Sequence, residues 1–166
     1  MYVTSYALTK NEYFEFRHNL IMQVIYNLDD LNEVIIIDND YVSVALTRIS
    51  IKKILGNTIR VVNFVNYSDA LNYLLKQKNG EPPIIFIDPF SDKGNNYSFL
   101  ERYMLLNLSC YVYILSNSIL MRDIGKCLAY KFVKKYITKP IKIDDLIFIF
   151  REIKSNGKGV GYNSLV

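Results

Sequence analysis

Several polar residues in this 166-residue sequence directly follow apolar runs and could take part in one chemistry. Asp88 follows the run IIFI and precedes Pro89, whereas Asp38, Asn39 and Asp40 follow the apolar residues 34–37. A buried carboxylate is costly unless it has partners, so Asp88 is either a turn residue at the end of a strand or a member of a charged site. Clustered carboxylates need a cation, and oxygen ligands suit Mg²⁺, which also leaves room for a phosphate oxygen.

Two further residues complete this set. Ser116 ends the run CYVYILS, and Lys139 ends KKYITK directly before Pro140. A carboxylate beside Mg²⁺ can attack a phosphoryl group, while a lysine and a serine hydroxyl can bind the phosphoryl oxygens. Each residue alone has a structural explanation, because Asp and Asn favour turns and Ser favours helix starts. Together at one edge of one sheet, they predict an acyl-phosphate site.

The elements that would position these residues alternate along the chain. Short β-branched apolar runs predict strands at 34–38, 59–64, 83–88, 110–116 and 134–139. Helical spacing of apolar residues predicts helices at 41–55, 68–78, 97–106, 119–131 and 143–154. This order predicts an α/β fold with a five-stranded parallel sheet and helices on both faces. Ligands in such folds bind beyond the carboxyl ends of the strands, where the polar residues lie.

The helices have recognisable faces and starts. In the first of these helices, Val42, Ala45, Leu46 and Ile49 share one face. Ser68 is the predicted N-cap of the second. In the helix at 68–78, Leu71, Leu74 and Leu75 are expected to point inward, as are Leu146, Ile149, Phe150 and Ile153 in the helix at 143–154. In the helix at 97–106, Phe99, Leu100, Tyr103 and Met104 are expected to share one face.

The chain ends differ from this alternating region. Residues 1–32 form a predicted N-terminal helical extension, 33–154 a single domain and 155–166 a flexible, Gly-rich tail. The apolar face of the extension consists of Tyr13, Phe16, Leu20, Ile21, Val24, Ile25 and Leu28. Something must cover this face, so the helix either packs on its own domain or serves in dimerisation or docking.

Composition excludes several classes of site and location. His18 is the single histidine, which excludes a metal site built from histidines and leaves only His18 for a His-dependent triad. Cys110 and Cys127 lie in apolar contexts and are expected to be buried free thiols. No apolar run approaches the roughly 18 residues that span a bilayer, so a cytoplasmic protein is expected.

Basic residues concentrate between Met121 and Lys142, where seven of them accompany one acid, Asp123. This segment is either a solvated basic face or a surface for an acidic partner. No aromatic RNA-binding motif or helix-turn-helix supports a nucleic-acid partner.

The ordered set of motifs supports a family resemblance. From about Glu33 to Lys154, the chain resembles the receiver domain of bacterial two-component response regulators, a flavodoxin-like, doubly wound fold similar to that of chemotaxis proteins. That family has an acidic pair, a phospho-accepting Asp, a Ser or Thr, and Lys-Pro after strands one, three, four and five. Here IIIDND, IIFID, VYILS and ITKP occur in that order, and Tyr136 stands at the family's aromatic switch position, three residues before the lysine.

The resemblance implies a phospho-accepting signalling domain rather than an enzyme. Asp88 would take the phosphoryl group from a histidine kinase or phosphotransfer protein, and Ser116 and Lys139 would bind it. Tyr136 would act as the switch. The implied Mg²⁺ ligands are Asp38, Asn39, Asp88 and the carbonyl of Phe90, with Asp40 as an acidic auxiliary.

The resemblance also implies where the signal leaves the domain. The surface formed by 119–131, 134–139 and 143–154 would change shape and bind a downstream protein. A homodimer through this surface or through the N-terminal helix is a further expectation, and a DNA-binding output domain is not expected.

Two alternatives remain open at this stage. Asn39 replaces the second acid of the family pair, Pro89 alters the loop after Asp88, and Asn117 stands where a very small residue is common. These departures suit a degenerate receiver that acts as a phosphorylation-independent binding module.

The second alternative comes from another class. IIIDNDYV also fits the opening motif of haloacid-dehalogenase-type phosphatases, with Asp38 as nucleophile, Asp40 as general acid and Lys139 in the third motif. That assignment gives Asp88 no role, and Asp144 and Asp145 begin a helix rather than follow a strand.

Overall fold

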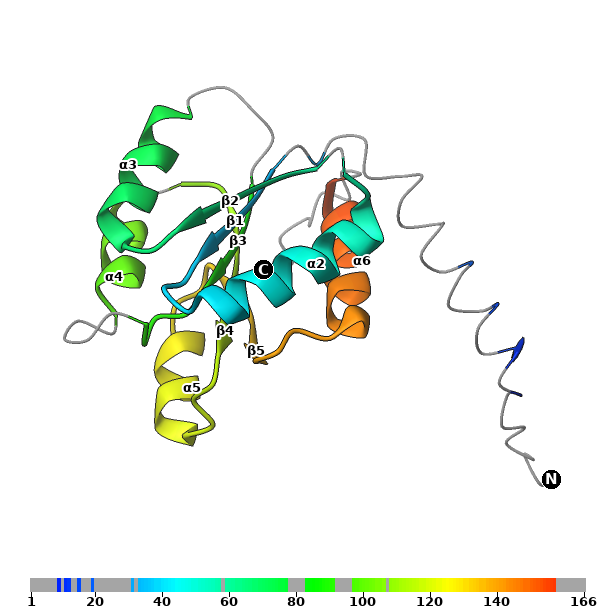
Figure 1. Cartoon of the computed structure of the whole chain (residues 1–166). Helices are drawn as coiled ribbons and strands as arrows, with labels where there is room; N and C mark the ends of the chain where they lie inside the picture. Colours follow the sequence, from blue (N-terminus) through cyan, green and yellow to red (C-terminus); the bar gives the residue numbers. More distant parts are fainter. Residues whose placement is uncertain are drawn as a thin grey trace, which may run out of the picture.

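The computed structural model describes residues 9, 11, 12, 15, 19, 31, 33–57, 59–77, 83–91, 97–106 and 108–157. From residue 33 onward, strands and helices alternate as the sequence predicts (Figure 1). The strands are β1 (Glu33–Ile37), β2 (Arg60–Phe64), β3 (Ile84–Ile87), β4 (Tyr111–Ser116) and β5 (Val133–Thr138). The helices are α2 (Tyr41–Leu55), α3 (Tyr67–Lys76), α4 (Ser98–Leu106), α5 (Met121–Leu128) and α6 (Ile143–Gly157).

The five strands form one parallel sheet in the order β2-β1-β3-β4-β5. From β1 the chain passes to β2 on one side and then to β3 on the other, which makes the carboxyl ends of β1 and β3 a topological switch point. The register pairs Ile37 with Ile87, so the residues that follow these strands are neighbours. The predicted α/β fold with a five-stranded parallel sheet is confirmed.

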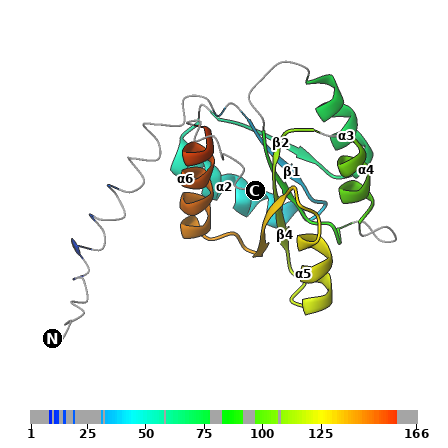
Figure 2. The ribbon, with the colours of Figure 1, turned by 180° about the vertical axis from the view of Figure 1, so that it is seen from behind.

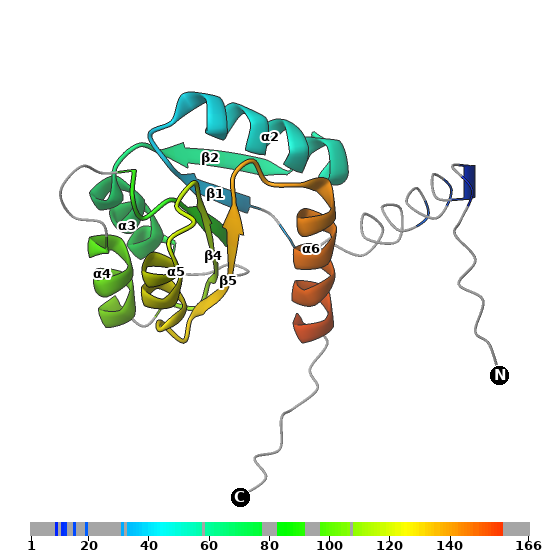
Figure 3. The ribbon, with the colours of Figure 1, turned by 90° about the horizontal axis from the view of Figure 1, so that it is seen from below.

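Helices cover both faces of the sheet, as the continuous apolar strands require. Helices α2 and α6 pack against Val34, Ile36 and Phe86 on one face. Helices α3, α4 and α5 pack against Ile35 and Ile85 on the other. Figures 2 and 3 show these two layers from behind and from below. Alternation of side chains along each strand thus divides one apolar run between two cores.

The helix starts show one correction to the sequence prediction. The side chain of Asp40 caps α2 by accepting hydrogen bonds from the backbone N–H groups of Val42 and Ser43. Helix α3 is capped by Asn66, whose side-chain oxygen accepts from Asp69 N at 2.9 Å, and not by the predicted Ser68. The helix begins at Tyr67, which is a buried residue. Asn66 directly before it has the extended backbone conformation of an N-cap.

The predicted helix faces are confirmed in part. Leu146, Ile149, Phe150 and Ile153 of α6 are all buried. In contrast, Met104 of α4 and Leu75 of α3, both predicted to lie with the buried residues, are 57% and 44% exposed. Each of these helices packs on the sheet with one side only, so only one stripe of its surface becomes buried.

Other predictions fall partly or wholly beyond the described residues. Helix α6 extends to Gly157, past the predicted end at 154, while residues 158–166 lie outside the described part of the chain. The apolar face predicted for residues 13–28 also lies outside it, as does His18. Both cysteines are free; Cys127 is buried as predicted, and Cys110 is partly exposed. No helix in the described residues is long and apolar enough to cross a membrane.

Candidate functional site

Two carboxylates and one ammonium group meet at the switch point of the sheet. Asp38 directly follows β1, Asp88 follows β3, and Lys139 follows β5. Lys139 Nζ lies 2.6 Å from Asp38 Oδ2 and 2.7 Å from Asp88 Oδ2. The three side chains are 3–9% exposed, so the interactions are poorly screened by water. The tertiary fold therefore brings together three residues that are far apart in the sequence.

Backbone hydrogen bonds fix the positions of these residues. Asp88 N donates to Ile37 O, Asp38 N to Phe64 O and Lys139 N to Ser116 O, each at 3.0 Å. These bonds continue the ladder of the parallel sheet for one residue beyond the strand ends. The site is therefore built on the rigid edge of the sheet.

The charges of the cluster do not balance. Burial alone would lower the pKa of Lys139, but hydrogen bonds to Asp38 and Asp88 and the charges of these carboxylates hold it above its ordinary value. The ammonium therefore stays protonated and compensates one of the two carboxylates. One negative charge is left over at a site built from oxygen atoms, which suits a divalent cation such as Mg²⁺.

The remaining carboxylate oxygens accept local backbone bonds. Asp38 Oδ1 accepts from Asp40 N, and Asp88 Oδ1 accepts from Phe90 N, each at 3.0 Å. Each oxygen still has a second lone pair, so these bonds are compatible with a metal ligand role. The donor set therefore fits a magnesium ion that retains several waters.

Two candidate ligands are directed elsewhere in this structure. The Asn39 side chain donates to the backbone carbonyl of Ser91, in the loop after Asp88. The Asp40 carboxylate caps α2. Within the described residues, no group of three or more His, Cys, Asp or Glu side chains is arranged to hold a metal ion. The carboxylates available at the site are thus those of Asp38 and Asp88.

Ser116 and Tyr136 occupy the neighbouring part of the site. Ser116 is 1% exposed at the end of β4, and its Oγ accepts from Ser118 N at 3.3 Å. The Tyr136 hydroxyl donates to the carbonyl of Ser118 at 2.8 Å. Burial raises the pKa of Tyr136, although hydrogen bonding to Ser116 and Ser118 opposes the rise. The predicted switch residue therefore lies against the loop that directly follows the predicted phosphoryl ligand.

The structure adds residues that the sequence did not indicate. The Tyr67 hydroxyl donates to the backbone carbonyl of Asp88 at 3.0 Å, and Ser91 Oγ donates to the same oxygen at 3.0 Å. Ser118 Oγ donates to Asp123 Oδ2 at 2.7 Å and ties the β4–α5 loop to α5. A tyrosine at a core position of α3 was the available signal for Tyr67, since a buried hydroxyl needs a partner.

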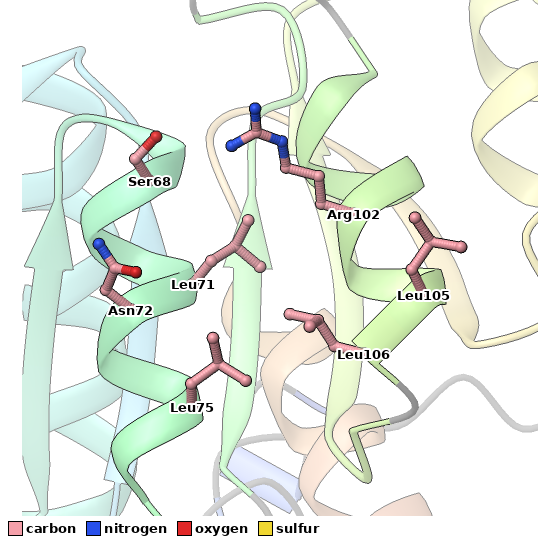
Figure 4. Close-up of a pocket in the computed structure, with 7 residues that line it drawn as sticks. All are labelled: Ser68, Leu71, Asn72, Leu75, Arg102, Leu105 and Leu106. Carbon is pink, nitrogen blue, oxygen red and sulfur yellow. The ribbon is translucent and has the colours of Figure 1, made fainter.

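A groove of about 360 Å³ lies away from these carboxylates, between α3 and α4 (Figure 4). Leu71 and Leu106 point into the space between the helices, and Arg102 reaches over one end. Its remaining lining residues are Ser68, Asn72, Leu75 and Leu105. None of these described lining residues is an acid, so the groove offers no carboxylate.

Comparison with known proteins supports the fold only. No family model and no curated protein matches the chain. A response regulator receiver protein from Dyadobacter fermentans is similar, with 20% identity, a TM-score of 0.62 and coverage of 72% of this chain and 95% of that one. A two-component response regulator from Cytophaga hutchinsonii has 22% identity, a TM-score of 0.65 and coverage of 76% and 98%. One from Clostridium difficile has 15% identity, a TM-score of 0.63 and coverage of 77% and 99%.

Proposed function

We propose that this chain, which has the fold of response regulator receiver domains, accepts a phosphoryl group on Asp88 from a partner's phosphohistidine. The partner would be a histidine kinase or a phosphotransfer protein. The observation that carries the proposal is the Lys139 ammonium, which bridges Asp38 and Asp88 at the switch point of the sheet. Such an arrangement offers a carboxylate nucleophile and a fixed positive charge at one place.

The transfer needs no further protein group as reactant. A carboxylate oxygen of Asp88 attacks phosphorus, the P–N bond to the imidazole breaks, and its electron pair stays on the imidazole nitrogen. The product is an acyl phosphate on Asp88. Lys139 would move with the phosphoryl oxygens as an ion-pair partner, and Ser116 Oγ would donate a hydrogen bond to one of them.

Magnesium would have a supporting role at this site. Asp38, Asp88 and the carbonyl of Phe90 would hold it, and Asn39 would join them by leaving the carbonyl of Ser91. When bound, Mg²⁺ would supply neutralising charge to the phosphoryl oxygens. Asn39 can offer an oxygen but no charge, so the affinity for Mg²⁺ would be lower than with an acid at that position.

The signal would leave through α5, β5 and α6. Tyr136 contacts the β4–α5 loop through Ser118, and Ser118 contacts α5 through Asp123. A phosphoryl group on Asp88 would draw Ser116 toward it, loosen these contacts and let Tyr136 move inward. A downstream protein would then bind the altered surface, with phosphorylation adding nearly two negative charges at the site.

Two observations favour a second candidate, a receiver fold that binds a partner without phosphorylation. Asn39 is directed at Ser91, and the Lys139 ammonium already compensates part of the buried negative charge. A phosphatase with Asp38 as nucleophile has less support, because its general acid Asp40 is engaged as the cap of α2.

Intact-mass measurement after incubation with Mg²⁺ and a small acyl-phosphate donor tests the proposal. We expect the chain to gain one phosphoryl group, and Asp88→Asn to gain none because it lacks the nucleophile. Asp69→Asn, which removes an exposed acid of α3, is the matched control and should gain the group.

The Asn39→Asp variant separates the first two candidates. If the wild type gains nothing and Asn39→Asp does, the fold retains a working nucleophile but the natural chain is a degenerate receiver. If neither gains the group while both remain folded, phosphoryl acceptance at Asp88 is wrong.

A further inference from the structure

Helices α3 and α4 lie side by side on one face of the sheet, and the groove between them is open to the outside. Leu71 and Leu106 point into this groove, which has a volume of about 360 Å³ (Figure 4). Leu75 and Leu105 also line it, so each helix contributes two leucines. Both walls of the groove are therefore largely apolar.

The apolar surface continues beyond the groove. Leu75 on α3 is 44% exposed, and Met104 and Leu105 on α4 are 57% and 80% exposed. An apolar surface that extends over two helices marks a contact with another molecule. A small ligand between the helices would leave Met104 and much of Leu105 in water, whereas a helix about 10 Å wide would cover them as well. The exposed residues therefore favour a protein segment as the occupant.

One end of the groove carries a positive charge. The Arg102 side chain reaches over the end at which Ser68 lies, whereas Leu75 lies toward the other end (Figure 4). Ser68 belongs to the first turn of α3, so the partial positive charge of that helix terminus lies at the same end. The groove thus has one cationic end and one apolar end.

No acid among the described residues compensates the charge of Arg102. Asp69 and Glu101 are the acids of α3 and α4, and neither forms an ion pair with it. Asp69 instead accepts a hydrogen bond from Asn66 Nδ2 at 2.7 Å. A guanidinium can form two parallel hydrogen bonds with a carboxylate, so Arg102 is suited to an acid of a partner.

An amphipathic helix matches both the apolar walls and the charged end. Helices dock in grooves through an apolar stripe whose side chains recur at i, i+3, i+4 and i+7. Such a stripe would place its side chains against the four leucines of the groove, and an acid at one end of the stripe would reach Arg102. The acid would also determine which end of the bound helix lies beside Ser68.

We propose that the groove between α3 and α4 binds an amphipathic helix of a partner protein, and that an acid at one end of its apolar stripe pairs with Arg102. This surface shares no residue with α5, β5 and α6, so the chain would have two separate surfaces for protein partners. The proposal does not depend on phosphorylation of Asp88, and its failure would leave the phosphoryl-acceptor role untouched.

Selection from a display library of helical peptides tests the proposal. Each peptide has about 15 residues, the length at which isolated helices become stable, with a varied apolar stripe and a varied residue at each end of it. We expect the selected peptides to share an acid at one fixed end of the stripe. Leu105→Glu should weaken their binding on the order of tenfold or more, because it places a carboxylate in the apolar contact.

A charge exchange tests the pairing with Arg102. Arg102→Glu should weaken binding of the acid-bearing peptides on the order of tenfold, and replacing the acid of the peptide with Lys should restore it. The matched control is Ile49→Glu on α2, where the side chain is 63% exposed, and it should leave the affinity unchanged. Fluorescence anisotropy of labelled peptides measures each Kd. All three substituted side chains are exposed, so the domain should still fold.

The outcomes divide by the site of binding. Loss of binding in Leu105→Glu but not in Ile49→Glu, together with restoration by the exchanged charges, supports the proposal. No selected peptide, binding that Leu105→Glu does not weaken, or a charge exchange that restores nothing overturns it. Sedimentation that shows a dimer dispersed by Leu105→Glu also overturns it and assigns the groove to a second copy of the chain. Saturable binding of decanoate in calorimetry, without any selected helix, overturns it in favour of a small apolar carboxylate.

Discussion

At the residue scale, the candidate site is a cluster in which one ammonium serves two carboxylates. Lys139 contacts Asp38 and Asp88 at less than 3 Å, in a region almost closed to solvent. Every buried side-chain nitrogen and oxygen in the described residues has a hydrogen-bond partner. The hydrogen bonds of the cluster are therefore satisfied, although its two carboxylates share one ammonium. Removing the Lys139 ammonium should therefore leave two uncompensated carboxylates, whereas removing the Asp88 carboxylate should leave a balanced pair.

Replacing Lys139 with Met should destabilise the protein far more than replacing Asp88 with Asn. Lys139→Met leaves two uncompensated buried carboxylates and should lower the free energy of unfolding by about 3 kcal/mol or more. Asp88→Asn leaves one carboxylate with one ammonium and should change it by less than about 1 kcal/mol. Urea unfolding at neutral pH measures both values.

The contribution of Lys139 should also depend on pH in one direction. Folding raises the pKa of Lys139, so its contribution to the free energy of unfolding is fully present below roughly pH 10.4 and is lost as the pH rises through the folded-state pKa.

Equal losses of unfolding free energy in Lys139→Met and Asp88→Asn would contradict the arrangement in which one ammonium serves both carboxylates.

At the element scale, the start of α3 differs between the sequence prediction and the structure. Ser68 and Asn66 are both residue types that cap helices, and both lie just before the buried apolar residues Ala70 and Leu71. The structure selects Asn66, because Tyr67 is buried under the sheet and its hydroxyl bonds the carbonyl of Asp88. The helix that supports the candidate site thus begins at Tyr67, its first buried residue.

Asn66→Ala should lower the free energy of unfolding by about 1 kcal/mol, because Asp69 N loses its acceptor. Ser68→Ala, at an exposed position inside the first turn, should change it by no more than a few tenths of a kcal/mol. Thermal or urea unfolding of the two variants compares them directly. A larger loss for Ser68→Ala would show that α3 begins later than the structure places it.

At the scale of the whole molecule, the sheet separates two cores. Cys127 of α5 is fully buried in the core shared with α3 and α4, whereas Cys110 is partly exposed. Burial raises the pKa of Cys127 to about 12, so its thiol stays protonated in the folded domain at neutral pH. Reaction at this thiol should therefore report opening of the core.

In a Cys110→Ser background, alkylation of Cys127 at pH 8.5 should be more than about a hundredfold slower in the native than in the urea-unfolded protein. The same pKa difference should make the free energy of unfolding fall as the pH rises above roughly 8.5, since only the unfolded chain then releases the thiol proton. Mass spectrometry of the alkylated protein follows the reaction. Comparable rates in both states would contradict the buried position of Cys127.

The sequence by itself determined the order of the elements and the edge of the sheet at which Asp38, Asp88, Ser116 and Lys139 lie. It could do so because hydrophobic periodicity is local and parallel strands end at a common edge. Only the tertiary structure decided that Lys139 bridges both carboxylates and that Asn39 is directed at Ser91. Such contacts depend on distances between residues remote in sequence, which no local pattern encodes.

The same limit explains the outward face of α2. Val42, Leu46 and Ile49 have the spacing of a core face, yet the face that packs on the sheet consists of Ser43, Val44, Thr47, Ile51 and Ile54. Packing of this second face in the core shared with β1 and α6 decides the orientation of the helix. Periodicity shows that a helix has an apolar face, and only the packed structure shows what that face meets.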